Sequence, residues 1–360
     1  MSRIFSAHSR VALFCRFEAE LAHAQAELGV VPAAAAVAIG EACAIPIADP
    51  PALLEDGWEK GTPLIPLLEE LRKLLAGDGG EWLHHGTTTQ DVVDTALVLQ
   101  MQAGLGVLAQ ELGEVAARLA ELADAHRHTP MMGSTFLQAA VPTTFGAKAA
   151  LWLSPLVGLR VELAERAAAL PVQLGGPVGD MASFGESGPD LVAGLARRLG
   201  LVAPLAPWHT DRSPLTTVVA VVERVAAAAA KIASDLSLLA QSGIEEIRMR
   251  AGGSSSMPHK QNPVDALNAL AAADVCHAVA GGVTAARPHE RERAVGAWHA
   301  EWALVPMVFE TAAACVAAVG RALAGLEVDT ARMAELAGAA LADTSHLIDL
   351  VLAAHRRAGA

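Results

Sequence analysis

A segment rich in small residues carries the strongest chemical signal in the sequence. It reads GGSSSMPHKQNP over residues 252–263. Glycine and serine at this density are typical of a mobile loop, and functional side chains are often carried on loops. The closing Asn262-Pro263 suits an N-cap followed by proline at the first helical position. A helix start carries free N–H groups and a partial positive charge, so with Lys260 beside it this one can bind an anion. The alternative is a flexible linker before a helix.

A second segment, HHGTTTQDVVDT over residues 84–95, also places a turn and hydroxyl groups before a long helix. Thr89 or Asp91 can cap that helix, and threonine hydroxyls with exposed amides can hold a carboxylate. Taken alone, the segment favours an ordinary capped helix start with His84 and His85 on the surface or in packing. A metal site at the two histidines is less favoured, because adjacent side chains point apart and no third ligand stands nearby.

A third segment reads MMGSTFLQAAVPTTFG over residues 131–146. Its polar residues Ser134, Thr135 and Gln138 are few and its flanks are apolar. The pattern predicts a buried loop that enters a helix, and nothing more follows from it alone.

The charge balance limits what these segments can bind. The formal net charge is −13, which disfavours nucleic acid and an anionic membrane surface as partners. The same charge repels an anionic substrate at long range, so an anion site must rest on local donors. Two anion-receptive helix starts and a serine-rich loop in such a protein predict a substrate with more than one carboxylate.

Helical periodicity dominates the rest of the chain and predicts an all-α fold. We expect a helix over 11–29 and short helices between 30 and 80, where prolines recur. Long apolar helices are predicted over about 91–127, 143–170, 215–250, 263–285, 298–325 and 330–357.

These predicted helices suggest three parts. They are an N-terminal helical domain (1–90), a central bundle of long helices (91–330) and a short C-terminal helix (331–360).

Composition indicates a cytoplasmic oligomer. Hydrophobic residues make up 53% and charged residues 18% of 360 residues. Charge, Gln, Pro or Gly interrupts each apolar stretch within the roughly 20 residues that a membrane span needs. The apolar excess is therefore expected to be buried between copies of the chain. No signal peptide is recognisable, and four separated cysteines are typical of reduced cytosolic thiols.

Taken together, the three segments resemble the fumarase/aspartase superfamily. Residues 253–263 are similar to its GSSxMPxKxN signature, and 84–95 and 131–146 are similar to its other two conserved regions, in the same order. The resemblance runs through nearly the whole chain and includes LGGPVG at 174–179 and PWHTDR at 207–212. RAVGAWHAEW at 293–302 resembles the branch of cycloisomerases that lactonise muconates.

This resemblance implies a cofactor-free, metal-free enzyme. It implies a helical bundle that associates as a homotetramer, with each active site built from several subunits and with the usual C-terminal domain largely missing. It implies that Ser255 is the catalytic proton-transfer group. The substrate-binding residues implied are His84, Thr88, Thr89, Gln138, Lys260, Asn262 and Arg293, with Arg291 as an alternative to Arg293.

Two departures from the superfamily pattern bear on the reaction. Phe136 stands where most members carry a general-acid histidine, and Leu267 stands at the spacing of an acidic residue. Ammonia or an alkoxide needs an acid to leave, whereas a carboxylate, with a pKa of about 4, does not. The departures therefore favour lactonisation by a carboxylate of the substrate.

Two rival functions stay open. One is a lyase of the same fold that releases nitrite or a stabilised amine from a succinate skeleton. The other is a non-catalytic structural member, against which the set Ser255, Met257, Lys260 and Asn262 argues.

Overall fold

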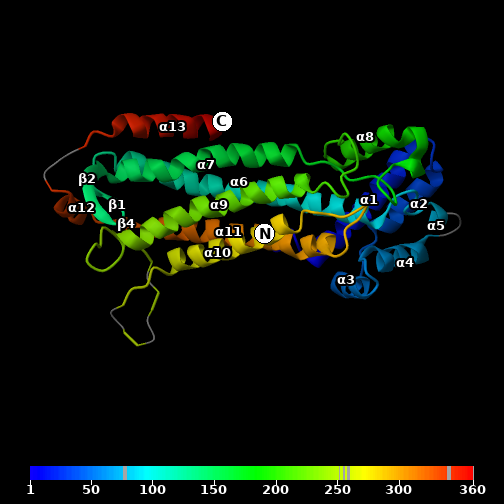
Figure 1. The fold of residues 1–360 in the computed structure, drawn as a ribbon, viewed down its shortest axis with the longest axis horizontal. Helices are drawn as coiled ribbons and strands as arrows, with labels where there is room; N and C mark the ends of the chain where they lie inside the picture. Colours follow the sequence, from blue (N-terminus) through cyan, green and yellow to red (C-terminus); the bar gives the residue numbers. More distant parts are fainter. Residues whose placement is uncertain (76–78, 251, 254–255, 258–259, 339–341, 360) are drawn as a thin grey trace. The chain divides into compact units, whose positions relative to one another are not determined.

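Most of the regular secondary structure of the protein is helical (Figure 1). The computed structural model describes residues 1–75, 79–250, 252–253, 256–257, 260–338 and 342–359. Its helices are α1 (Ala7–Glu27), α2 (Ala33–Ala44), α3 (Pro50–Glu59), α4 (Leu64–Leu74), α5 (Gly79–Trp82), α6 (Thr89–Ala125), α7 (Phe145–Ala168), η1 (Ala182–Ser187), α8 (Gly188–Leu199), α9 (Ser213–Leu239), α10 (Val264–Ala285), α11 (Ala297–Ala324), α12 (Thr330–Ala337) and α13 (Ser345–Gly359). Its strands are β1 (Pro130–Thr135), β2 (Gln138–Thr144), β3 (Ile247–Arg248) and β4 (Glu327–Val328).

The chain divides into two compact units, and each unit is assembled from three separate stretches of sequence. Unit 1 comprises Met1–Leu105, Arg166–Val218 and Gly282–Pro306. Unit 2 comprises Gly106–Glu165, Val219–Gly281 and Met307–Ala360. The long helices α6, α7, α9, α10 and α11 each give one part to each unit.

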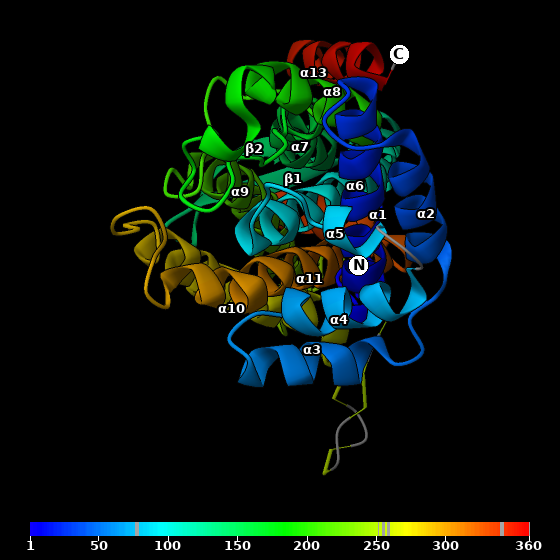
Figure 2. The ribbon, with the colours of Figure 1, turned by 90° about the vertical axis from the view of Figure 1, so that its right-hand side faces the viewer.

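Unit 1 is organised around α1, which packs against α2, α3 and α8 (Figure 2). Ser6 caps the helix, because its Oγ accepts a hydrogen bond from the Ser9 amide at 3.2 Å. Phe14, Phe17 and Leu21 recur at helical spacing and are at most 1% exposed. They lie in one hydrophobic core with residues of α6, α8 and the start of α11. This face of α1 therefore supplies the centre of unit 1.

Unit 2 is a packed set of helices with a hairpin attached. Small residues let the helices approach closely, as where the Cys315 thiol lies 3.7 Å from the Ala226 carbonyl oxygen. The indole N–H of Trp152 donates to Asp235 at 2.7 Å and joins α7 to α9. Strands β1 and β2 pair antiparallel, and α12 packs against β1.

The structure corrects three details of the predicted elements. The helix expected over 215–250 ends at Leu239, because a turn at Gly243 (φ 89°) leads into β3, which pairs with β4. The helix expected over 330–357 is two helices, the first of which ends at Ala337, just before Gly338 (φ 71°). The segment 131–146 is an antiparallel hairpin rather than a buried loop, and Val141 within it is 68% exposed.

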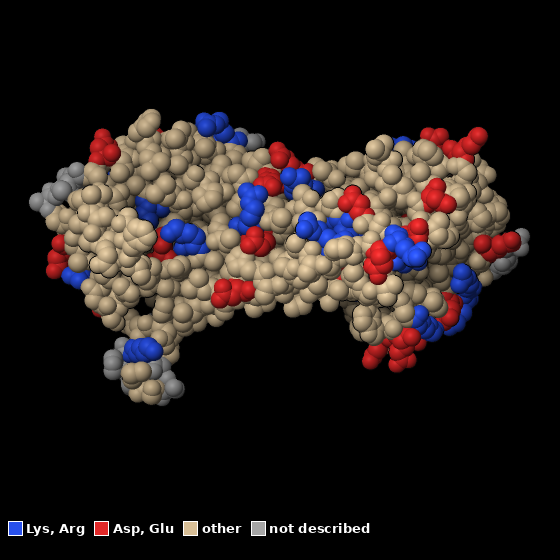
Figure 3. Space-filling model, in the orientation of Figure 1, with Lys and Arg blue, Asp and Glu red and all other residues tan. Residues whose placement is uncertain are grey.

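The apolar character of the long helices leaves uncharged surface on the single chain. By length and composition alone, α6, α10 and α11 are able to cross a membrane. The most apolar window is 72% buried in α6 and 56% in α11, but only 33% in α10. On the face shown in Figure 3, charged residues stand in small groups of mixed sign, with broad uncharged areas between them.

A buried ionic cluster lies in unit 1. The guanidinium of Arg212 is fully buried and donates to both carboxylate oxygens of Asp94 at 2.7 and 3.0 Å. It also donates to both oxygens of Glu301 at 2.6 and 3.0 Å. Burial opposes the charge of Arg212, but Asp94 and Glu301 outweigh it and raise the pKa of the guanidinium. The cluster joins α6, the start of α9 and α11 within unit 1.

We predict that Arg212→Met destabilises the protein by about 3–5 kcal/mol, because it removes the guanidinium that pairs with the buried carboxylates of Asp94 and Glu301 and leaves Glu301 only the His289 ring, 3.4 Å away. The matched control is Arg118→Met, since Arg118 makes an exposed pair with Glu121 and such pairs are worth about 1 kcal/mol or less. Urea unfolding of both variants at constant m-value measures the difference. Equal losses for the two variants would contradict the prediction.

Candidate active site

The second of the three segments, residues 84–95, folds as a capped helix start in unit 1. Helix α6 begins at Thr89, so Thr88 is its N-cap residue. Asp91, three residues further on, accepts from the Thr88 amide at 3.1 Å and from the Thr87 hydroxyl at 2.9 Å. A side chain at this position that bonds back to the N-cap amide is half of a capping box. Thr88 and Thr89 are half-buried at a helix N-terminus, where an anion is favoured.

Asp91 also binds two distant segments of unit 1. Its carboxylate accepts from the amides of Gly175 at 2.8 Å and Gly176 at 2.9 Å. It lies 2.8 Å from Nε2 of His209 and is fully buried. Gly176 has φ 76°, a left-handed conformation that suits glycine. One carboxylate thus contacts both the motif at 174–179 and the motif at 207–212 and joins them to the segment 84–95.

Arg293 reaches the segment 84–95 from the stretch before α11. Its guanidinium donates to Thr88 Oγ1 and Gln90 Oε1, both at 3.0 Å, and to the Pro177 carbonyl at 3.2 Å. All three acceptors are uncharged, so they leave the positive charge of Arg293 unneutralised. Arg291 is exposed and has φ 52°. Of the two arginines that the sequence left open, Arg293 is therefore the one in contact with Thr88.

The two adjacent histidines have different partners. Nδ1 of His84 lies 2.7 Å from Oε1 of Glu18. The ring of His85 packs on Trp82, with centroids 5.0 Å apart, and its carbonyl accepts from Gln25 at 2.8 Å. Among the residues that the structure describes, no three His, Cys, Asp or Glu side chains are grouped so as to hold a metal ion.

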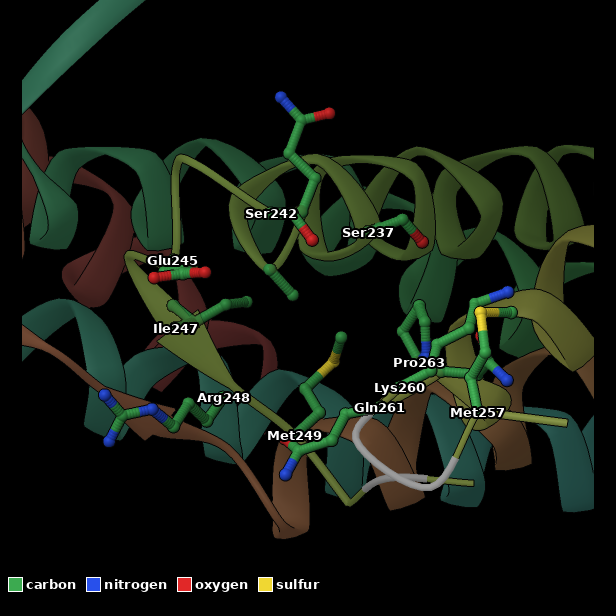
Figure 4. A pocket seen from close by; sticks show the side chains of 13 residues that line it. Ser237, Ser242, Glu245, Ile247, Arg248, Met249, Met257, Lys260, Gln261 and Pro263 are labelled. Atoms are coloured by element: carbon green, nitrogen blue, oxygen red, sulfur yellow. The ribbon is translucent and has the colours of Figure 1, made fainter. Parts of the chain in front are cut away.

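The signature segment lines a cavity of about 750 Å³ in unit 2 (Figure 4). The lining side chains come from the end of α9, from the stretch through Met249 and from the segment that leads into α10. Lys260 and Asn262 both lie here. The cavity residues are Ser237, Ala240, Gln241, Ser242, Glu245, Ile247, Arg248, Met249, Met257, Lys260, Gln261, Asn262 and Pro263.

The predicted start of α10 is displaced by one residue. Helix α10 begins at Val264, so Pro263 occupies the N-cap position that was predicted for Asn262. The amide nitrogen of the Asn262 side chain donates to the Gly253 carbonyl at 3.4 Å instead. Ser255, the predicted proton donor, lies outside the described residues.

The third segment, residues 131–146, supplies most of the β1–β2 hairpin in unit 2. Phe136 and Leu137 are the turn residues, with φ 52° and 61°, and are 99% and 72% exposed. Gln138 is the first residue of β2 and is exposed. The predicted site residues thus fall into two sets. His84, Thr88, Thr89 and Arg293 belong to unit 1, and Gln138, Lys260 and Asn262 belong to unit 2.

Sequence reasoning missed several residues of the unit 1 site. Asp91 was predicted only as a possible cap, although it is the common acceptor of three segments. Gln90 and His209 were not singled out, and His209 had a signal in the motif PWHTDR. Glu18 lies 66 positions from His84, and no local pattern marks it.

Comparison with known proteins places these features in a family. The family model described as "Lyase" matches residues 3–281. Four enzymes named 3-carboxy-cis,cis-muconate cycloisomerase are 35–42% identical to the chain. The one from Pseudomonas aeruginosa is 42% identical over 342 residues, which cover 92% of this chain and 74% of that protein. A nitrosuccinate lyase from Streptomyces davaonensis is 39% identical over 88% of this chain and 70% of its own length.

A solved structure shows the same fold. The 3-carboxy-cis,cis-muconate lactonizing enzyme from Pseudomonas putida superposes with a TM-score of 0.88 at 35% identity, over 100% of this chain and 82% of that one. The predicted all-α fold of the fumarase/aspartase type is thereby confirmed. The predicted division at residues 90 and 330 stays a prediction.

We predict that Gly86→Ala, in the turn between His84 and Thr88, lowers the free energy of unfolding by more than the left-handed backbone conformation at this position explains. A Cβ there meets a ring carbon of Phe184 at 2.7 Å, and φ is 73°. The matched control is Gly61→Ala, with φ 76° and nothing within 4 Å, which isolates the left-handed strain of about 1–2 kcal/mol. The clash adds about 1–3 kcal/mol at Gly86. Thermal unfolding compares the two variants, and equal shifts would count against the crowding.

Proposed function

The chain belongs to the lyase family, and from that premise we propose that it lactonises 3-carboxy-cis,cis-muconate to 4-carboxymuconolactone in the catabolism of protocatechuate. The observation that carries the proposal is its identity of up to 42% with enzymes of that name across most of the chain. The enzyme is an intramolecular lyase, or cycloisomerase, and its substrate is a small polycarboxylate.

The reaction needs no second reactant. A carboxylate oxygen of the substrate forms a C–O bond with one alkene carbon, and the displaced electron pair moves to the neighbouring carbon. Conjugation spreads this charge onto another carboxylate as an aci-carboxylate. Ser255 gives its proton to the carbon and regains one from water, so the ionised substrate takes up one proton overall, no group leaves, and substrate and product are isomers as free acids. Holding the attacking carboxylate near the alkene replaces a bimolecular encounter.

The residues of unit 1 form the proposed carboxylate-binding part of the site. Thr88 and Thr89 offer hydroxyls and a helix start, and Arg293 adds a charge that its present partners leave unneutralised. His84 adds a ring nitrogen. In unit 2, Lys260 stabilises the developing aci-carboxylate, and Asn262 in the same cavity binds substrate. Gln138, the first residue of β2, is the further substrate-binding residue proposed there.

The phenylalanine at position 136 limits the reactions that the site can catalyse to those that need no general acid from this residue. An imidazole at this position would serve to protonate a poor leaving group, whereas Phe136 cannot transfer a proton. A carboxylate nucleophile needs no such acid. Leu267, 49% exposed on α10, likewise supplies none. Elimination of nitrite from nitrosuccinate also needs no acid, so this reaction is the rival that an experiment has to separate.

We further propose a cytoplasmic homotetramer whose active sites combine segments from different copies. The apolar surface of α10 supports this, because Leu267 and Val275 are 49% and 45% exposed on the single chain. An apolar face of this kind is typical of an interface. The net charge of −13 supports neither nucleic acid nor an anionic membrane as a partner.

We predict that the purified protein lactonises 3-carboxy-cis,cis-muconate, followed by loss of the diene absorbance, and that nitrosuccinate releases no nitrite. Ser255→Ala should lower kcat by about 100-fold or more with KM little changed, because the lost interaction acts in proton transfer rather than binding. Ser256→Ala, the neighbouring hydroxyl, is the control. Faster turnover of nitrosuccinate than of the muconate would favour the rival lyase.

We predict that two inactive variants restore activity when they are mixed. Ser255→Ala and Arg293→Gln disable residues of different units. If a site combines these residues from different copies of a symmetric tetramer, an equal mixture refolded together recovers up to roughly a quarter of wild-type turnover. Light scattering checks the tetramer. No recovery in mixed tetramers would mean that both residues serve a site from the same chain.

A further inference from the structure

Glu18 is a buried carboxylate that the proposed reaction does not use. It lies on α1, is 1% exposed, and its Oε1 is 2.7 Å from Nδ1 of His84. Its other oxygen, Oε2, is buried and has no hydrogen-bond partner among the described residues. Burying a carboxylate is costly unless it is paired, so this position demands an explanation.

Helix α1 holds the histidine pair at two points. Glu18 contacts the ring of His84, and Gln25, about two turns further along α1, donates to the carbonyl of His85 at 2.8 Å. His84 has φ 64°, a left-handed conformation that is uncommon outside glycine. Such a conformation persists only where neighbouring contacts hold it, and here the two contacts from α1 do so. The orientation of the His84 ring is therefore set from outside its own segment.

The negative charge of Glu18 favours the protonated form of the His84 ring as its partner. The thiols of Cys15 and Cys43 lie close enough to interact with the charge of Glu18, but a thiol cannot carry positive charge. His84, in direct contact with Glu18 Oε1, is able to supply a counter-charge. An imidazolium satisfies Glu18 through Nδ1–H and leaves a second N–H, on Nε2, for a ligand. The His84 side chain keeps 16% exposure for this purpose.

We infer that Glu18 is a positioning residue for substrate binding. It holds His84 through Nδ1 as an imidazolium, and Nε2–H of His84 donates to a carboxylate of the substrate. This inference rests on the proposed function, because it assigns a partner to a residue of that site. Glu18 acts through His84 and does not touch the substrate.

The test compares two isosteric changes on the same helix. Glu18→Gln keeps the shape and an acceptor oxygen but removes the charge. We expect KM for 3-carboxy-cis,cis-muconate to rise about tenfold, equivalent to 1.4 kcal/mol, with kcat changed less than about threefold. The reason is that the variant weakens the hydrogen bond from His84 to a substrate carboxylate, which is equally strong in the ground state and the transition state. The control is Glu20→Gln, which removes a half-buried partner of Arg198 and should leave both constants unchanged. Glu18→Asp, which shortens the reach, replaces Glu18→Gln if that variant does not fold.

A double-mutant cycle separates positioning from a general structural role. If Glu18 acts through His84, KM of the double variant Glu18→Gln/His84→Ala equals that of His84→Ala alone. Increases in KM that multiply would overturn the inference. The downfield proton resonance of a carboxylate-bound imidazole Nδ1–H gives a readout without turnover. It should be present in wild type and Glu20→Gln, and absent in Glu18→Gln and His84→Ala.

The same variants distinguish failure of this inference from failure of the proposed function. If wild type does not lactonise the muconate, the proposed function fails. Calorimetric binding of 3-carboxy-cis,cis-muconate then decides the role of Glu18. Binding about tenfold weaker in Glu18→Gln than in wild type supports the inference, and equal binding, or none in wild type, overturns it.

Discussion

The fully buried carboxylate of Asp91 is the contact on which the order of unit 1 depends. A carboxylate in this position is tolerated only when its lone pairs are satisfied, and here amides, a hydroxyl and an imidazole all point at it. The glycine-rich stretch at 174–179 and the stretch around His209 have no regular hydrogen-bond ladder of their own. Asp91 bonds to both of them, Gln90 adds a hydrogen bond to the His209 carbonyl, and Arg293 donates to Pro177 within the glycine-rich stretch.

The first turns of α6 bind buried basic side chains on the inside and leave an anion-receptive helix start at the tip. Asp91 and Asp94 face the interior, where they contact His209 and Arg212 respectively. Thr88 and Thr89 at the tip remain half-buried beside Arg293. The acidic side chains that would repel an anion are thereby occupied inside, while the helix N-terminus and an arginine stay available to it. This separation explains how a chain of net charge −13 can hold a carboxylate at this point.

The long helices followed from the sequence because apolar periodicity is a local property that packing reinforces. Their ends were less predictable. Helix α9 stops at Leu239 because β3 pairs with β4, about 80 residues away. The hairpin at Pro130–Thr144 depends on strand pairing that no pattern in its sequence indicates. In the site, the residue types of the three motifs were predictable. Their partners were not, because Glu18 and His209 reach them through contacts between distant segments.

The division of each unit into three stretches of sequence has a consequence for how the chain is made. The core around Phe14 and Phe17 includes Trp298 and Trp302, so it cannot be completed until the ribosome has passed residue 302. At about 5–20 residues per second, the apolar face of α1 waits some 15–60 seconds for these tryptophans. During synthesis that face is open to other nascent chains and to chaperones. The core of unit 1 is therefore completed only late in synthesis, and a ribosome that stalls before α11 leaves the apolar face of α1 uncovered.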